Sequence, residues 1–187
     1  MKTIQILAVV LMTVLLPVTA QKADINVAKS SVKWTGNKVG GSHNGAIKIK
    51  SGAFQFKNGD IAGGTVVIDM NTITCEDLTN EGANQKLVGH LKSDDFFGVE
   101  KFPTATFKVT KATKFNNNKA SITGVLTIKG KSETVTFDVT KSGSVYSAKL
   151  EVDRSKFDVR YGSKSFFDNL GDNFIHDIFV LDIQLVF

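Results

Sequence analysis

The chain has one cysteine and two prolines among its 187 residues. A lone cysteine excludes an internal disulfide, and so few prolines exclude a proline-rich or collagen-like chain. Because 42% of the residues are hydrophobic and 22% are charged, the composition is that of a globular protein and not of a disordered chain. We expect Cys75 to be a buried small apolar residue; a reactive thiol is the alternative.

Only one long apolar run occurs, at residues 6–16, and it is too short to cross a bilayer. Lys2 precedes the run and small residues follow it up to Ala20, a pattern typical of a secretory signal peptide. We therefore expect residues 1–20 to be a signal peptide cleaved after Ala20. Residues 21–187 then form a single periplasmic or secreted domain without a transmembrane segment.

Charge of one sign is not concentrated anywhere in the chain. The formal net charge is +5, and lysines such as Lys48, Lys108 and Lys149 stand singly along alternating segments. A basic stripe with interleaved aromatic residues, which nucleic-acid binding requires, is missing. The sequence thus predicts no nucleic-acid partner, while the mild positive charge can steer a small anionic ligand.

Motifs for catalysis and metal binding are also missing. His43, His90 and His176 lack a ligand spacing such as His-x-x-x-His, and Cys75 has no partner cysteine, so we predict no metal site. The sequence has no Gly-x-Ser-x-Gly turn and no glycine loop that opens a helix. The carboxylate pair at 94–95 is more simply explained by capping and solvation than by acid/base catalysis. We therefore predict a protein that is not an enzyme and has no cofactor.

Alternation of apolar and polar residues dominates the rest of the chain, for example at 105–110, 122–129 and 146–153. Asn58-Gly59 between two such runs is a strong signal for a hairpin turn. The pattern predicts eight or nine antiparallel strands. Closing the sheet into a barrel would remove its edges, and glycines within strands favour the barrel over a sandwich. The predicted fold class is therefore all-β.

One interval, 76–92, breaks the alternation. Leu87 and Leu91 are four residues apart, and the preceding Thr74-x-x-Asp77 resembles a capping box, so we expect a helix there. The last strand, at about 174–187, carries apolar residues on both faces. We expect the helix to cover its outer face.

The inner faces of the predicted strands are rich in phenylalanine, of which the chain has 14 against 2 tyrosines and 1 tryptophan. An eight-stranded barrel is either filled by its own side chains or holds one slender ligand, and the same residues serve both. His43 and Arg154 could place donors near one mouth, where they would hold a phosphate or polar head group; a structural hydrogen bond is the alternative for each. The candidate ligand-binding residues are Trp34, His43, Ile47, Phe54, Phe56, Phe107, Phe137, Tyr146, Leu150, Arg154 and Phe179.

Several short blocks follow one another along the chain. They are WxG at 34–36, HxG at 43–45, HLKSDDFF at 90–97, KFPTATF at 101–107, GxLTIKG at 124–130 and RSxF at 154–157. In this order they closely resemble the YceI-like proteins, a bacterial group of exported, lipocalin-like, polyisoprenoid-binding proteins. The resemblance covers essentially the whole chain after residue 20.

The resemblance implies an extended eight-stranded antiparallel lipocalin-like barrel with a helical insertion. It also implies an apolar tunnel that takes the isoprene tail of a quinone-like or prenyl-phosphate lipid, and it implies no catalytic residues. The chain departs from the family pattern at two places. Residues 85–89 lack the Arg-Asp common there, and Asp158 stands where glycine often follows Phe157.

We therefore expect a protein that binds, and transports or stores, an isoprenoid or other long-chain lipid in the bacterial periplasm. It would be a monomer or weak dimer that contacts membranes transiently. Two other classes stay open. One is a filled barrel that docks to other envelope components under stress, and the other is an enzyme that uses His43 and a nearby carboxylate on a small hydrophobic substrate.

Overall fold

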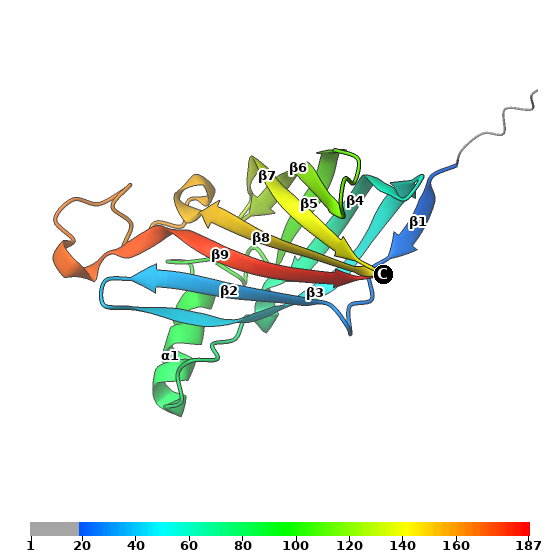
Figure 1. Ribbon diagram of the computed structural model, residues 1–187. Helices are drawn as coiled ribbons and strands as arrows, with labels where there is room; N and C mark the ends of the chain where they lie inside the picture. The colour runs from blue at the N-terminus through cyan, green and yellow to red at the C-terminus, as the bar shows by residue number, and fades with distance from the viewer. Residues whose placement is uncertain (1–18) are drawn as a thin grey trace, which may run out of the picture.

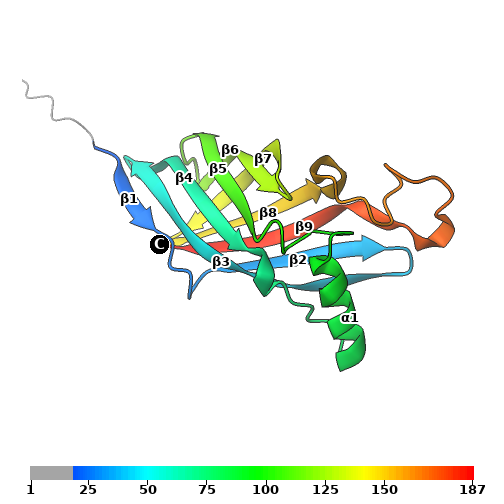
Figure 2. The same ribbon diagram turned by 180° about the vertical axis from the view of Figure 1, so that it is seen from behind.

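The computed structural model describes residues 19–187. The predicted signal peptide lies outside the described residues except for its last two positions, and it stays a prediction. The described chain forms a sheet that curves round on itself, with one α-helix beside it (Figures 1 and 2). No helix within 19–187 is long and apolar enough to cross a membrane.

The elements follow one another with short connections, except between β4 and β5 and between β8 and β9. The strands are β1 (Gln21–Asp24), β2 (Ser31–Lys38), β3 (Gly41–Lys57), β4 (Asp60–Asp69), β5 (Thr104–Ala112), β6 (Lys119–Ile128), β7 (Lys131–Ser142), β8 (Val145–Asp153) and β9 (Ile175–Val186). The helix is α1 (Glu81–Lys92), and the 3-10 helices are η1 (Met70–Thr72), η2 (Arg154–Phe157) and η3 (Gly171–Asn173).

Eight of these strands form a closed antiparallel barrel. Their order is β3-β2-β9-β8-β7-β6-β5-β4, and pairing of β3 with β4 closes the ring. β3 is 17 residues long; it pairs with β2 up to Ile47 and with β4 from Lys48 onward, and the pairing with β4 has two register shifts. The short β1 pairs with the second half of β3. The predicted eight-stranded barrel is confirmed.

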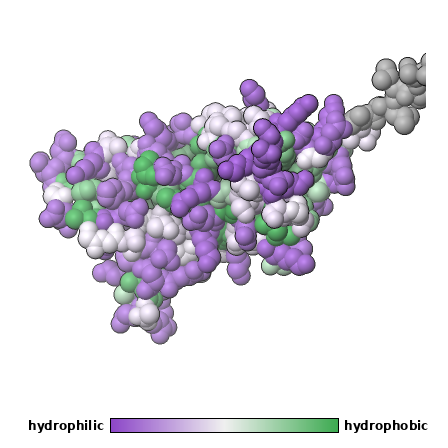
Figure 3. Space-filling view, in the orientation of Figure 1, coloured by the Kyte–Doolittle hydropathy of each residue, from purple (hydrophilic) through white to green (hydrophobic). Residues whose placement is uncertain are grey.

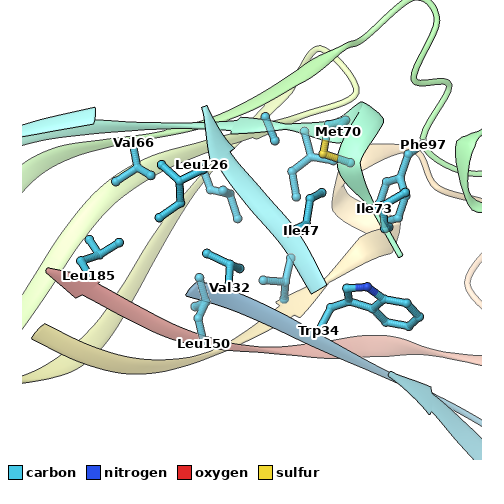
Figure 4. Packing of buried hydrophobic residues seen from close by; sticks show 14 of the residues in the cluster. Val32, Trp34, Ile47, Val66, Met70, Ile73, Phe97, Leu126, Leu150 and Leu185 are labelled. Atoms are coloured by element: carbon cyan, nitrogen blue, oxygen red, sulfur yellow. The ribbon is translucent and has the colours of Figure 1, made fainter. Parts of the chain in front are cut away.

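The alternating residues divide as the sequence predicted, with apolar side chains inside and polar ones outside. β6 shows this clearly, because every second residue from Ala120 to Ile128 is buried while the alternate residues are partly exposed. Figure 4 shows inward side chains from several strands meeting in the barrel. The face seen in Figure 3 is mostly hydrophilic, with small hydrophobic areas.

The helix begins later than predicted. Asn80 caps it by accepting a hydrogen bond from the backbone N–H of Ala83 at 2.9 Å, and its first residue is Glu81. The residues from Thr74 to Asp77, predicted as a helix start, instead run along the beginning of β3. Thr74 N–H donates to the Ala46 carbonyl at 2.9 Å. Tertiary pairing with β3 has therefore replaced the local capping pattern.

The expectation that the helix covers the last strand is wrong. Ile178, on the outer face of β9, is 43% exposed. α1 lies beside β2 and β3 instead (Figures 1 and 2), and Leu91 is its one buried residue. Polar residues such as Asp182 and Gln184 share the outer face of β9 and keep the strand solvated.

A glycine in β3 lets the segment after η1 pack against the barrel. The Thr74 carbonyl accepts a hydrogen bond from Trp34 Nε1 at 3.0 Å directly over Gly45. A Cβ on Gly45 would lie 1.9 Å from the Thr74 carbonyl oxygen, so any side chain there must push the segment away.

We expect Gly45→Ala to lower the free energy of unfolding by about 1–3 kcal/mol, the usual cost of forcing extra volume into a packed site. Gly41→Ala in the same strand is the control, since a Cβ there meets nothing within 4 Å. Urea denaturation of both variants measures the difference. Equal stability of the two variants would contradict the packing described.

Candidate functional site

Two apolar cavities lie inside the described barrel. The C-end cavity, of about 90 Å³, is lined by residues that include Phe54, Phe107, Phe137, Tyr146 and Leu150. The helix-end cavity, of about 130 Å³, is lined by residues that include Trp34, Ile47, Leu91, Phe97, Arg154 and Phe179. Both cavities also contact Val32, Ile68, Ala105, Leu126 and Leu181, which we call the shared wall.

The cavity walls are almost entirely hydrocarbon. An apolar cavity of roughly 150 Å³ accepts benzene and excludes water, and a five-carbon isoprene unit is of similar size. The helix-end cavity is close to this size and the C-end cavity is smaller, so each holds at most about one such unit. A longer chain would have to pass the shared wall, so side chains such as Leu126 and Leu181 would need to move apart.

Aromatic side chains close the end of the barrel at which the chain terminates. Phe56, Tyr146 and Phe187 pack around one another, with ring centroids 5.1–5.7 Å apart. Phe56 is therefore part of this closure and does not line either cavity. β1 and the chain terminus lie at this end of the molecule, and α1 lies toward the other end (Figure 1). Because Leu91 of α1 lines the helix-end cavity, this cavity is at the end away from the aromatic closure.

Arg154 is 2% exposed and lies at the wall of the helix-end cavity. Its guanidinium donates hydrogen bonds to the backbone carbonyls of His176, Val159 and Ile175 at 2.9–3.2 Å. Asp177 forms an ion pair with it at 3.3 Å. Burial lowers the pKa of Arg154, and the charge of Asp177 opposes that effect. The geometry thus favours the structural alternative for Arg154, which ties η2 to the start of β9.

His43 lies outside both cavities, although it shares the strand face of Ile47. Its Nδ1 is 2.7 Å from Asp77 Oδ2, while Asp77 Oδ1 accepts hydrogen bonds from Asn44 N–H at 2.8 Å and from Cys75 Sγ at 3.3 Å. Burial raises the pKa of Asp77, but these hydrogen bonds outweigh it and lower the pKa to about 2. His43 and Arg154 each have their own partners and do not form one polar mouth.

The thiol of Cys75 is buried, as the sequence predicted. Burial raises its pKa, and the neighbouring Asp77 carboxylate adds to the effect. Burial and the carboxylate both disfavour the thiolate, so a reactive thiol is not supported.

Nine of the eleven residues expected at the ligand site line one cavity or the other; His43 and Phe56 do not. Sequence reasoning missed the shared wall and the residues of α1 and the following loop, including Leu91, Phe96 and Phe97. Ala105 and Leu126 could have been found from the alternating pattern, because they fall on the inner faces of their strands. The loop residues have no periodicity, and only the HLKSDDFF block marks them.

The fold and the cavities define the class of protein: it is a closed antiparallel barrel with an apolar interior, similar to the lipocalins. The sequence model of the YceI-like domain matches residues 24–187. The chain therefore belongs to the YceI-like family, as the sequence blocks predicted.

Individual proteins are also similar to this chain in sequence. A UPF0312 protein of Vibrio parahaemolyticus is 29% identical over 171 residues, covering 82% of this chain and 87% of the relative. A UPF0312 protein of Vibrio cholerae is 28% identical over 125 residues, which span 64% of each chain.

Two solved structures share the fold. BcnA of Burkholderia cenocepacia aligns with a TM-score of 0.65 at 26% identity, over 87% of this chain and 99% of its own. A polyisoprenoid-binding domain from Saccharophagus degradans aligns with a TM-score of 0.58 over 87% of this chain and 95% of its own. At 12% identity, the second likeness concerns the fold alone.

Proposed function

We propose that this protein binds the hydrocarbon tail of an isoprenoid or similar long-chain lipid inside the barrel, and that it carries or stores this lipid in the periplasm. The observation that carries the proposal is the pair of hydrocarbon-lined cavities on either side of a shared wall. The Saccharophagus degradans domain, which has the same fold and is described as polyisoprenoid-binding, supports it.

The hydrophobic effect supplies the affinity. Burying an apolar chain gains about 0.8 kcal/mol for each methylene-sized group removed from water. The walls offer almost no polar partner, and the donors of Arg154 are engaged with backbone carbonyls. A quinone or phosphate head group therefore stays outside the cavities, and affinity depends on the tail.

The tail enters from the α1 end. At the opposite end Phe56, Tyr146 and Phe187 pack against one another and seal the barrel. At the α1 end the helix-end cavity is covered by Leu91 and by Phe96 and Phe97 of the following loop.

We infer a binding role and not a catalytic one. The acid/base-like pair of His43 and Asp77 lies outside the cavities, and the carboxylates at 94–95 face the surface. A filled barrel that only docks is the less favoured alternative, since the shared wall separates two cavities of a size that holds hydrocarbon groups.

The identity of the lipid is tested by purifying the protein from its native host without detergent and analysing an organic extract by mass spectrometry. We expect a prenyl-chain lipid in amounts approaching one per protein. An exported protein of similar size, purified in the same way, controls for lipid carry-over. Repeated extracts that contain no more lipid than this control would overturn the proposal.

A further inference from the structure

Three side chains with metal-binding atoms converge beside the barrel, outside both cavities. They are His43 of β3 and Cys75 and Asp77 of the segment after η1. The imidazole nitrogen, the thiol sulfur and a carboxylate oxygen all lie within 4.8 Å of one another. This group belongs to no part of the lipid-binding proposal and does not depend on it.

The backbone holds the three side chains in place. Thr74 and Glu76 donate their backbone N–H groups to the carbonyls of Ala46 and Asn44, at 2.9 and 2.8 Å. The segment is thus extended along β3, and in an extended segment residues two apart point to the same side. Cys75 and Asp77 therefore face the same way, toward His43.

Asp77 is fixed further by Asn44, whose backbone N–H donates to Oδ1 at 2.8 Å. This hydrogen bond leaves Oδ2 directed at His43 Nδ1, 2.7 Å away. A carboxylate oriented in this way by a backbone donor is the usual support for a metal ligand. The Asn44 hydrogen bond can stay in place when a metal ion binds, while the ion replaces the contacts that Asp77 makes with His43 and Cys75.

The chemistry of the three groups matches a divalent transition metal. Imidazole, thiolate and carboxylate are the ligands of Zn²⁺, and on a tetrahedral Zn²⁺ ion their donor atoms lie about 3.3–3.8 Å apart. The present separations need only small side-chain movements to reach these values. Thiolate and carboxylate together carry two negative charges, which neutralise the ion.

We propose that His43 Nδ1, Cys75 Sγ and the Asp77 carboxylate bind a divalent transition metal ion, with Zn²⁺ the best fit. Binding releases the thiol proton of Cys75 to solvent and leaves His43 neutral with its proton on Nε2, so that Nδ1 is free to bind and a neutral site forms around the ion. The side chains of His43 and Asp77 are 24% and 25% exposed, so solvent reaches the cluster. A water molecule or an external ligand completes the fourth position.

Cobalt(II) tests the site, because it replaces Zn²⁺ and reports its ligands by absorption. Titrating the full mature protein with Co²⁺ under reducing conditions should give a thiolate-to-metal charge-transfer band and the visible bands of a four-coordinate ion. Excess Zn²⁺ should abolish both. The absence of these bands in the wild-type protein would overturn the proposal.

Three conservative variants identify the ligands: Cys75→Ser, His43→Gln and Asp77→Asn. Changing a group that only orients a metal ligand costs about 10–100-fold in affinity, so each variant should weaken Co²⁺ binding by about a hundredfold or more. Glu76→Gln is the matched control, since this exposed residue lies between the two ligands on the opposite side of the segment. It should bind Co²⁺ as the wild type does.

Thermal unfolding supplies a second readout. Zn²⁺ should raise the midpoint of the wild-type protein and of Glu76→Gln, and leave that of Cys75→Ser unchanged. Equal Co²⁺ affinity in Cys75→Ser and the wild type would show that the cluster is only a hydrogen-bonded anchor. Because the cluster lies outside the cavities, lipid binding should be the same in all variants, so failure of one proposal is distinguishable from failure of the other.

Discussion

Replacing Ala105 by phenylalanine should strongly weaken binding of a long prenyl lipid while the barrel stays folded. Ala105 of β5 is 6% exposed, opposes Ile68 of β4, and belongs to the wall that both cavities share. A ring at this position fills the space through which a tail must pass. Part of the ring occupies existing cavity volume, so the destabilisation should not exceed the usual overpacking cost of about 1–3 kcal/mol.

Displacement of a fluorescent lipid by prenyl alcohols of increasing length measures this effect. We expect the affinity of Ala105→Phe for long tails to fall by a factor of ten or more. Lys108→Phe is the control, because Lys108 lies on the outer face of the same strand. A folded Ala105→Phe protein that binds prenyl alcohols as the wild type does would place the lipid outside the barrel.

Arg154→Met should lower the free energy of unfolding by about 3–5 kcal/mol, the typical cost of removing one partner of a buried ion pair. The substitution leaves the Asp177 carboxylate without its ion-pair partner, and it removes the donors for the carbonyls of Val159, Ile175 and His176. The methionine side chain keeps much of the packing volume, so the loss arises mainly from polar groups left unsatisfied.

Chemical denaturation measures this loss against Arg160→Met, which removes an exposed arginine paired with Asp158. A surface ion pair contributes about 0–1 kcal/mol, so the control should be close to wild type. We further expect that Arg154→Met binds lipid normally wherever it is folded. A stable Arg154→Met protein that loses affinity only for lipids with anionic head groups would show that the guanidinium is a head-group ligand after all.

The strands could be predicted from the sequence because every second residue is apolar, and one face of a barrel strand must be buried. The start of the helix could not be predicted in this way. Thr74-x-x-Asp77 satisfies a local capping pattern, yet pairing with β3 holds these residues extended. The prediction that the helix covers the outer face of β9 was wrong for a similar reason. Apolar residues such as Ile178 suggested that this face is buried, but their neighbours on it are polar.

Asp158 shows what a sequence departure means once its conformation is known. It ends η2 with φ +59°, a left-handed conformation that glycine adopts freely and that aspartate tolerates better than most residues. The departure from glycine at this position is therefore accommodated by the backbone.

The candidate site was only partly predictable. Parity places Phe54 and Phe107 inside the barrel, but whether inward rings fill the space or line a cavity depends on how side chains of different strands meet. His43 lies on the same strand face as Ile47, yet it is nearer the end of the strand, where its partner is Asp77. The convergence of His43, Cys75 and Asp77 escapes any spacing rule, since backbone pairing between distant segments creates it.

The most direct test is a crystal structure of the protein loaded with a prenyl alcohol of several isoprene units. We expect continuous density for the tail through the helix-end cavity, past Ala105 and Leu126, into the C-end cavity. Leu126 and Leu181 should adopt side-chain positions different from those described. Density for the lipid on the outer surface only, with both cavities unchanged, would contradict the account.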